Sequence, residues 1–153
     1  MNEYIPGDQF RTVLDFAFGI AGRGIPLCVA VLEPESWPPE GDDASHEEAI
    51  EALARSIADR TRRTDRVTRA GRARFEALLM DCNRQGAMVF ADRLLEVATD
   101  FTTRTGVHVV CGVAAYREGM TASAELLAAA ERGLERARSS GQGGVGLAPD
   151  LEG

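Results

Sequence analysis

Two short strand-like segments, residues 66–70 (RVTRA) and 75–80 (FEALLM), are separated by only four residues, Gly71 to Arg74. This spacing and the glycine in the connection predict a β-hairpin. Strands joined this closely pair antiparallel, because a parallel pair needs a connection of about a dozen residues or more. Any sheet that this chain forms therefore contains at least one antiparallel pair.

Segments with helical and strand-like patterns alternate around this hairpin. Apolar spacing predicts helices over residues 8–22, Ser45 to about Arg62, Asn83 to about Thr103, and 121–139. Continuous apolar runs predict buried strands over 25–33 and 106–114, and we expect a short edge strand near Val145. A hairpin within an alternating pattern predicts an α/β fold (an α+β sandwich), with a mixed central sheet of about five strands and helices on its faces.

Length and composition agree with one globular domain. The 153 residues fall within the usual ~100–200 residues per domain, and 44% of them are hydrophobic. We place the domain at residues 8–147 and expect residues 148–153 to form a flexible tail. The sequence has no apolar run of membrane-spanning length and no secretion signal at its start, which predicts a cytoplasmic protein.

Neither the cysteines nor the histidines predict a metal site. Cys28, Cys82 and Cys111 are widely spaced within apolar runs, which is typical of buried, reduced thiols rather than of a disulfide or a zinc site. His46 and His108 are far apart and have no partner at ligand spacing.

The charges are unevenly distributed along the chain. The net charge of -7 argues against a nucleic-acid partner. All 17 basic residues are arginines, and seven of them lie within residues 60–74 together with a single acid, Asp65. A local cationic patch on an acidic protein favours a compact anionic ligand over a polyanion. The alternative is a solvated arginine face without a ligand.

Three stretches, in this order, resemble the GGDEF domain of diguanylate cyclases. Residues 64–79 (TDRVTRAGRARFEALL) are similar to the family's hairpin motif, DxVxRxGGDEFxxLL. Residues 107–114 (VHVVCGVA) are similar to its TVSIGVA strand, and residues 130–141 (AERGLERARSSG) to its ADxALYxAKxxG helix. The resemblance covers roughly residues 8–147 and implies a fold like that of the nucleotidyl cyclases.

The same resemblance implies a degenerate active site. In the family, hairpin glycines approach the GTP phosphates, and acids of the hairpin and of the first strand hold Mg²⁺. The corresponding hairpin residues are Gly71, Arg72, Ala73, Arg74 and Phe75. Arginine stays protonated and repels a metal ion, so only Glu33 and Glu35, at the first-strand position, could still be ligands. We therefore expect no catalytic residue, no Mg²⁺ and no cyclase activity.

An intact R-x-x-D pair precedes the hairpin. Arg62 and Asp65 lie at the spacing of the family's inhibitory site, which binds cyclic di-GMP, and Arg93 falls where that site draws a second arginine from the next helix. A guanidinium can fork onto O6 and N7 of guanine, and a carboxylate can accept from its N1 and N2 groups. The resemblance thus implies a ligand site formed by Arg62, Asp65 and Arg93, with Arg66 adding to the positive field.

The sequence leaves three functions open. The first is a cyclic di-GMP receptor that signals through an unidentified protein partner; a stacked ligand dimer can also bridge two copies of the chain. The second is a nucleotide-free interaction scaffold that uses, for example, the Trp37 loop, with Arg62 and Asp65 forming only an exposed ion pair. The third is a residual GTP-binding or cyclase domain.

Overall fold

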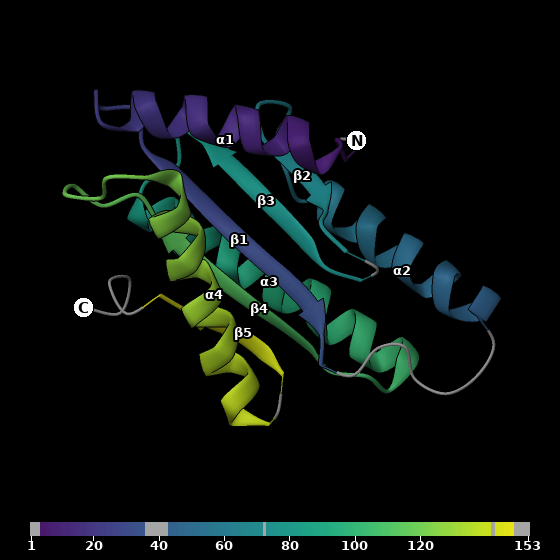
Figure 1. Cartoon of the computed structure of the whole chain (residues 1–153). Coiled ribbons are helices and arrows are strands. Elements are labelled where there is room, and N and C mark those ends of the chain that lie inside the picture. Colours follow the sequence, from purple (N-terminus) through teal and green to yellow (C-terminus); the bar gives the residue numbers. More distant parts are fainter. Residues whose placement is uncertain (1–3, 36–42, 72, 142, 149–153) are drawn as a thin grey trace.

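The computed structural model describes residues 4–35, 43–71, 73–141 and 143–148 of the chain (Figure 1). The helices and strands follow the predicted order. They are α1 (Gly7–Ala21), β1 (Leu27–Pro34), α2 (Asp43–Ala58), β2 (Arg66–Arg69), β3 (Phe75–Met80), α3 (Arg84–Thr105), β4 (Val109–Ala115), α4 (Ser123–Ser140) and β5 (Gly144–Leu147). None of the helices in the described ranges is long and apolar enough to cross a membrane.

The described strands form one mixed sheet in the order β2-β3-β1-β4-β5. The β2–β3 hairpin is antiparallel, as predicted, and its loop is closed by a hydrogen bond from Ala70 N to Arg74 O of 2.8 Å. β1 pairs antiparallel with both β3 and β4, whereas β4 and β5 are parallel. The predicted sheet of about five strands is confirmed, and β1 forms its centre.

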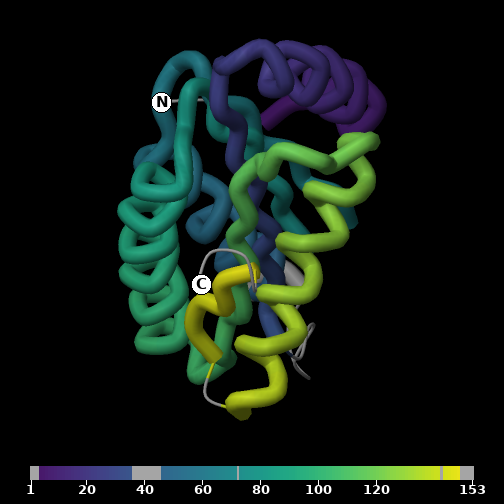
Figure 2. Tube along the Cα trace, turned by 90° about the vertical axis from the view of Figure 1, so that its left-hand side faces the viewer, coloured from purple at the N-terminus to yellow at the C-terminus, as the bar shows by residue number. Residues whose placement is uncertain are grey.

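Helices cover both faces of the sheet. α2 and α3 lie on one face, and α1 and α4 lie on the other (Figures 1 and 2). β1 is buried on both faces, as predicted: Ala30 and Leu32 pack in the core under α2 and α3, and Val29 and Val31 in the core under α1 and α4. The sheet is therefore the middle layer of a three-layer sandwich.

The predicted helix and strand boundaries agree with the structure to within three residues, except at the end of α2. α2 ends at Ala58 instead of near Arg62, because the amides of Arg60 and Thr61 bond three residues back, which tightens and ends the last turn. Ala148, the first residue of the predicted tail, is buried, and its amide donates to Val113 O at 2.9 Å. The rest of the predicted tail, 149–153, lies outside the described residues.

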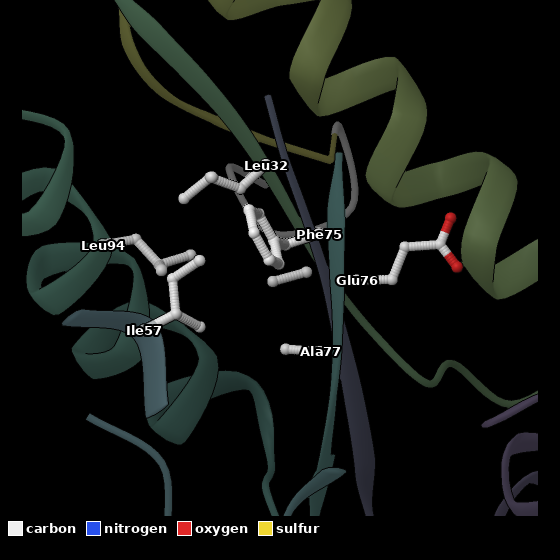
Figure 3. Close-up of a pocket in the computed structure, with 7 residues that line it drawn as sticks. Leu32, Ile57, Phe75, Glu76, Ala77 and Leu94 are labelled. Carbon is white, nitrogen blue, oxygen red and sulfur yellow. The ribbon is translucent and has the colours of Figure 1, made fainter. Parts of the chain in front are cut away.

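Alternate side chains of β3 point to opposite faces of the sheet, as strand geometry requires. Figure 3 shows Phe75 and Ala77 on the side of Ile57 and Leu94, whereas the Glu76 carboxylate points to the opposite side. The space between the apolar side chains measures about 10 Å³, which holds at most one water molecule. This space is a packing defect and not a ligand site, but the opposite face of β3 carries a buried charge.

Candidate functional site

The first candidate region is the hairpin itself, where Arg74 contacts three carboxylates. Its Nε lies 3.2 Å from Glu76 Oε2, its Nη2 lies 2.8 Å from Glu131 Oε1, and its Nη1 lies 3.7 Å from Glu33 Oε2. The acids come from three separate elements, β1, β3 and α4. Arg72, another predicted hairpin residue, lies outside the described residues. The guanidinium of Arg74 thus acts as a fixed cation that ties the sheet to α4.

Glu33 is the first-strand acid that the sequence left as a possible metal ligand. Both of its carboxylate oxygens are paired, Oε2 with Arg74 and Oε1 with Arg138. Two like unit charges 4 Å apart repel each other by about 4 kcal/mol near a protein surface, and the repulsion between an arginine and a divalent cation is twice as large. The two arginines are therefore ion-paired with the carboxylate that the sequence left as a possible metal ligand.

Glu76 is buried with 2% of its side chain exposed, and two arginines neutralise it. Arg11 Nη2, from α1, lies 3.1 Å from Glu76 Oε1, and Arg74 contacts Oε2. Removing one partner of a buried ion pair leaves an uncompensated charge, which is more costly than losing a surface pair.

We expect Arg74→Ala to lower the free energy of unfolding by about 2–4 kcal/mol, because Glu76 is then left with Arg11 alone. The matched control is Arg104→Ala, which removes an exposed pair with Asp100 and should cost about 0.5 kcal/mol or less. Urea denaturation of both variants measures the difference. We call Arg74 and its three carboxylate partners, Glu33, Glu76 and Glu131, the Arg74 network. Equal losses in the two variants would show that this network contributes no more to stability than an exposed ion pair does.

The second candidate region is a cavity of about 310 Å³ at the opposite end of the hairpin strands. The structure brings Arg62, Asp65 and Arg93 together in its lining. Arg62 and Asp65 come from the turn between α2 and β2, and Arg93 comes from α3. The cavity thus joins segments that are about 30 residues apart in the sequence. We call this cavity the arginine pocket.

Asp65 organises one wall of the arginine pocket from a buried position, with 2% of its side chain exposed. Its Oδ2 accepts from the backbone N of Arg62 at 2.7 Å, and its Oδ1 accepts from the backbone N of Met80 at 3.2 Å. The Arg62 guanidinium adds two longer contacts, 3.5 Å from Nε and 3.4 Å from Nη2. Arg62 and Asp65 do form the i,i+3 ion pair, but only the Arg62 side chain is exposed, whereas the Asp65 carboxylate is a buried anchor for two backbone amides.

The connection from β3 to α3 forms a second wall. Arg62 Nη2 donates to Met80 O, so Asp65 and Arg62 together hold both backbone groups of Met80. Asp81 follows with a positive φ of 49°, which an aspartate tolerates better than most residues. Asn83 then caps α3, as predicted, by accepting from Gly86 N at 2.9 Å. This cap sets the start of the helix that carries Arg93.

Arg66 and Arg60 occupy positions that the sequence did not indicate. Arg66, which the sequence assigned to the ligand site, does not line the arginine pocket; its Nη1 donates to the carbonyls of Arg63 and Asp65 instead. Arg60 does line the pocket, although the sequence did not single it out. Residues 60, 62 and 65 converge because they lie in the turn that follows α2. The predicted helix continued to about Arg62, and helical spacing would have placed these side chains on different sides.

The arginine pocket is suited to a planar, anionic ligand with paired acceptors. The Arg62 side chain is 53% exposed, and the exposed Arg93 forms no ion pair with any described residue. Guanidinium groups in such positions can form bidentate hydrogen bonds with a purine edge or a phosphate. Apolar atoms of Leu79 and Phe90 line the same cavity and can contact a base.

Comparison with known proteins agrees with this architecture. A family model described as the diguanylate cyclase GGDEF domain matches residues 41–144. No curated protein matches the chain. The GGDEF domain of YfiN (TpbB) from Pseudomonas aeruginosa has a TM-score of 0.82 at 22% identity, over 97% of this chain and 98% of that one.

Two further solved structures have the same fold. The GGDEF domain of DgcB from Caulobacter crescentus, solved in complex with c-di-GMP, gives a TM-score of 0.79 at 20% identity, over 95% of this chain and 91% of that one. The active GGEEF domain of a diguanylate cyclase from Vibrio cholerae gives 0.77 at 15% identity, over 95% of this chain and 98% of that one. At these identities the likeness concerns the fold.

Proposed function

Because this chain belongs to the diguanylate cyclase GGDEF domain family, we propose that it binds cyclic di-GMP as a receptor and does not synthesise it. The observation that carries the proposal is the convergence of Arg62, Asp65 and Arg93 on one cavity. The DgcB domain, which shares the fold, was solved with c-di-GMP, and this supports the choice of ligand.

The geometry suggests how a guanine would enter. When the Arg62 side chain rotates toward a ligand, it gives up two long contacts with Asp65, at 3.4 and 3.5 Å, and its hydrogen bond to Met80 O, which the contacts with the ligand must replace. This rotation of the Arg62 side chain frees two acceptor positions on Asp65, while the backbone amides of Arg62 and Met80 keep the carboxylate in place. Asp65 can then accept from the N1 and N2 donors of guanine while Arg62 pairs with O6 and N7.

The size of the arginine pocket limits how much of the ligand it encloses. A volume of about 310 Å³ lies at the lower end of the ~300–1,000 Å³ typical of small-molecule sites. We expect one guanine and its adjoining phosphate to occupy the pocket, with Arg93 pairing with the phosphate. The second guanine then lies at the surface, where a stacked ligand dimer can bridge two copies of the chain.

The absence of synthesis follows from the Arg74 network. Ala73 and Arg74 replace the two acids that the family motif provides, and both oxygens of Glu33 are already paired with arginines. A receptor without turnover passes its signal through a protein partner, and Val89, an exposed apolar residue that lines the arginine pocket, lies where such a partner could sense the ligand. The buried free thiols agree with a cytoplasmic location.

We expect purified protein incubated with GTP and Mg²⁺ to form no cyclic di-GMP, because Arg74 and Arg138 hold the carboxylate that a metal would need. Chromatographic product analysis measures this, with an active GGDEF domain as the positive control. Product that accumulates in proportion to the protein concentration would overturn the inactive assignment and favour the residual-enzyme alternative.

Ligand binding is tested by thermal denaturation. At a ligand concentration of about 100 times Kd, binding adds about 2.7 kcal/mol to the stability of the folded state. For a domain of this size we expect cyclic di-GMP to raise Tm by roughly 5–10 °C. GTP and GMP serve as matched nucleotide controls and should produce much smaller shifts. No shift at a saturating concentration of cyclic di-GMP would favour a nucleotide-free scaffold; Trp37, the anchor suggested for it, lies outside the described residues.

A further inference from the structure

Two cysteines meet beneath the arginine pocket. We propose that Cys28 and Cys82 form a redox modification site, which hydrogen peroxide converts into an intramolecular disulfide. The effect of this disulfide on ligand binding rests on the proposed function, whereas the formation of the disulfide does not.

Both sulfur atoms lie next to the same backbone carbonyl, that of Asn83. Cys28 Sγ, on β1, donates to Cys82 O at 2.9 Å and lies 3.4 Å from Asn83 O. Cys82 Sγ lies 3.8 Å from the same Asn83 oxygen. The backbone supports this approach, because Cys82 N donates to Pro26 O at 3.1 Å, next to the paired residues Leu27 and Met80. The pair therefore lies on adjacent, hydrogen-bonded segments.

Cys82 is the most exposed of the three cysteines. Cys82 lines the arginine pocket and is 7% exposed, whereas Cys28 and Cys111 are completely buried. A side-chain hydrogen bond between the two thiols lowers the pKa of Cys82, and the charge of Arg62 acts in the same direction, against burial and the negative charges of Asp65 and Asp81. The same hydrogen bond and burial raise the pKa of Cys28. Cys82 is thus the nucleophile, since the thiolate is the reactive form, and Cys28 is the resolving thiol.

The chemistry balances with hydrogen peroxide as the oxidant. The Cys82 thiolate attacks one peroxide oxygen, so that an S–O bond forms, the O–O bond breaks and hydroxide leaves and is protonated to water. The Cys28 sulfur then attacks the sulfur of the sulfenic acid; the S–S bond forms, the S–O bond breaks, and the thiol proton leaves with the oxygen as a second water. Two thiols are oxidised, and one peroxide is reduced to two waters.

The disulfide would act on the elements that shape the arginine pocket. Cys82 lies between Met80, whose backbone Arg62 and Asp65 hold, and Asn83, which caps α3. Its sulfur also packs against the first turn of α3, since a Cβ built on Gly86 would lie 2.9 Å from it. Drawing this sulfur toward Cys28 therefore shifts the segment between the two ligand-binding arginines, and a bound ligand in turn covers Cys82.

The test begins with the wild-type protein, treated with hydrogen peroxide and digested with trypsin without reduction. Cleavage at arginine places the three cysteines on different peptides, residues 24–55, 75–84 and 105–117. We expect a cross-linked 24–55/75–84 pair that a dithiol removes, and an unmodified 105–117 peptide. Oxidation of Cys82 without this cross-link, or cross-links only between chains, would overturn the proposal.

Binding is then measured before and after oxidation. Oxidation should weaken the affinity for cyclic di-GMP at least tenfold, and prior addition of the ligand should slow cross-linking severalfold. Cys28→Ser should abolish the cross-link, and Cys111→Ala should leave it unchanged. An unchanged affinity in fully cross-linked protein would refute the coupling. If the reduced protein binds no cyclic di-GMP, the proposed function fails. The peptide masses still decide whether Cys28 and Cys82 form the disulfide.

Discussion

A variant with both Arg62→Ala and Arg93→Ala should bind cyclic di-GMP at least about 100-fold more weakly than the wild type. The bidentate contact of Arg62 contributes roughly 1–3 kcal/mol to recognition of a guanine, and the charged hydrogen bond of Arg93 to a phosphate contributes about 1.5–3 kcal/mol. Each 1.4 kcal/mol corresponds to a factor of ten in affinity, so the middle of these ranges gives a loss of more than about 100-fold. Both side chains line the arginine pocket, so their losses act on the same bound ligand. Isothermal titration calorimetry measures the change directly.

The matched control for this variant is Arg63→Ala combined with Arg104→Ala. It also removes two positive charges, one from the turn after α2 and one from helix α3, but neither of its side chains lines the arginine pocket. Its affinity should stay within about threefold of the wild type, because both side chains are exposed, lie outside the lining and act on the ligand only through solvent-screened charge. An equal loss of affinity in both double variants would mean that a diffuse positive field, rather than a defined site, binds the ligand.

Gly112→Ala should lower the free energy of unfolding by more than about 4 kcal/mol, a large part of the ~5–15 kcal/mol that stabilises a typical domain. A Cβ built on Gly112, in β4, would lie 1.9 Å from Ala130 O and 2.4 Å from Leu134 N. Both atoms belong to the backbone of α4, so no side-chain rotation can relieve the overlap. The substitution must push α4 away from the sheet, which also separates Glu131 from Arg74 and Arg138 from Glu33.

Gly19→Ala is the matched control for the glycine prediction. Gly19 lies within α1, and nothing comes within 4 Å of a Cβ built there. Alanine favours a helix over glycine by roughly 0.5–1 kcal/mol, so this variant should be as stable as the wild type or slightly more stable. Chemical denaturation of both variants provides the comparison. Stability of Gly112→Ala within about 1 kcal/mol of the wild type would show that α4 adjusts easily.

The sequence predicted the local features of the fold because neighbouring residues determine them. The short connection between β2 and β3 required an antiparallel pair, and the apolar run of β1 required burial on both faces. Asn83 could be recognised as a cap from its position before the apolar stripe of α3. The end of α2 was misplaced, although its last buried apolar residues, Ile57 and Ala58, mark it.

The candidate sites were only partly predictable, because their side chains converge from distant segments. A family resemblance selected Arg62, Asp65 and Arg93, but only the folded chain places Asp65 under Met80 and adds Arg60 to the lining. Arg66, which the sequence placed in the ligand site, donates to nearby carbonyl oxygens and does not line the arginine pocket.

The partners of Arg74 show the same limit more strongly. Glu33, Glu76 and Glu131 come from three elements spread over nearly 100 residues of the sequence. The sequence showed that Arg74 replaces an acid of the family motif, but it gave no sign that the new guanidinium would be fully engaged by carboxylates. Such a network depends on the packing of α4 against the sheet, which no local pattern encodes.

Calorimetric titration of the reduced wild-type protein with cyclic di-GMP tests the central claim most directly. The arrangement of Arg62, Asp65 and Arg93 predicts a saturable heat of binding with a Kd of about 1 μM or below. This corresponds to a binding free energy of about -8 kcal/mol or a more negative value. The absence of any binding heat up to about 1 mM ligand, in protein shown to be folded by circular dichroism, would contradict the claim.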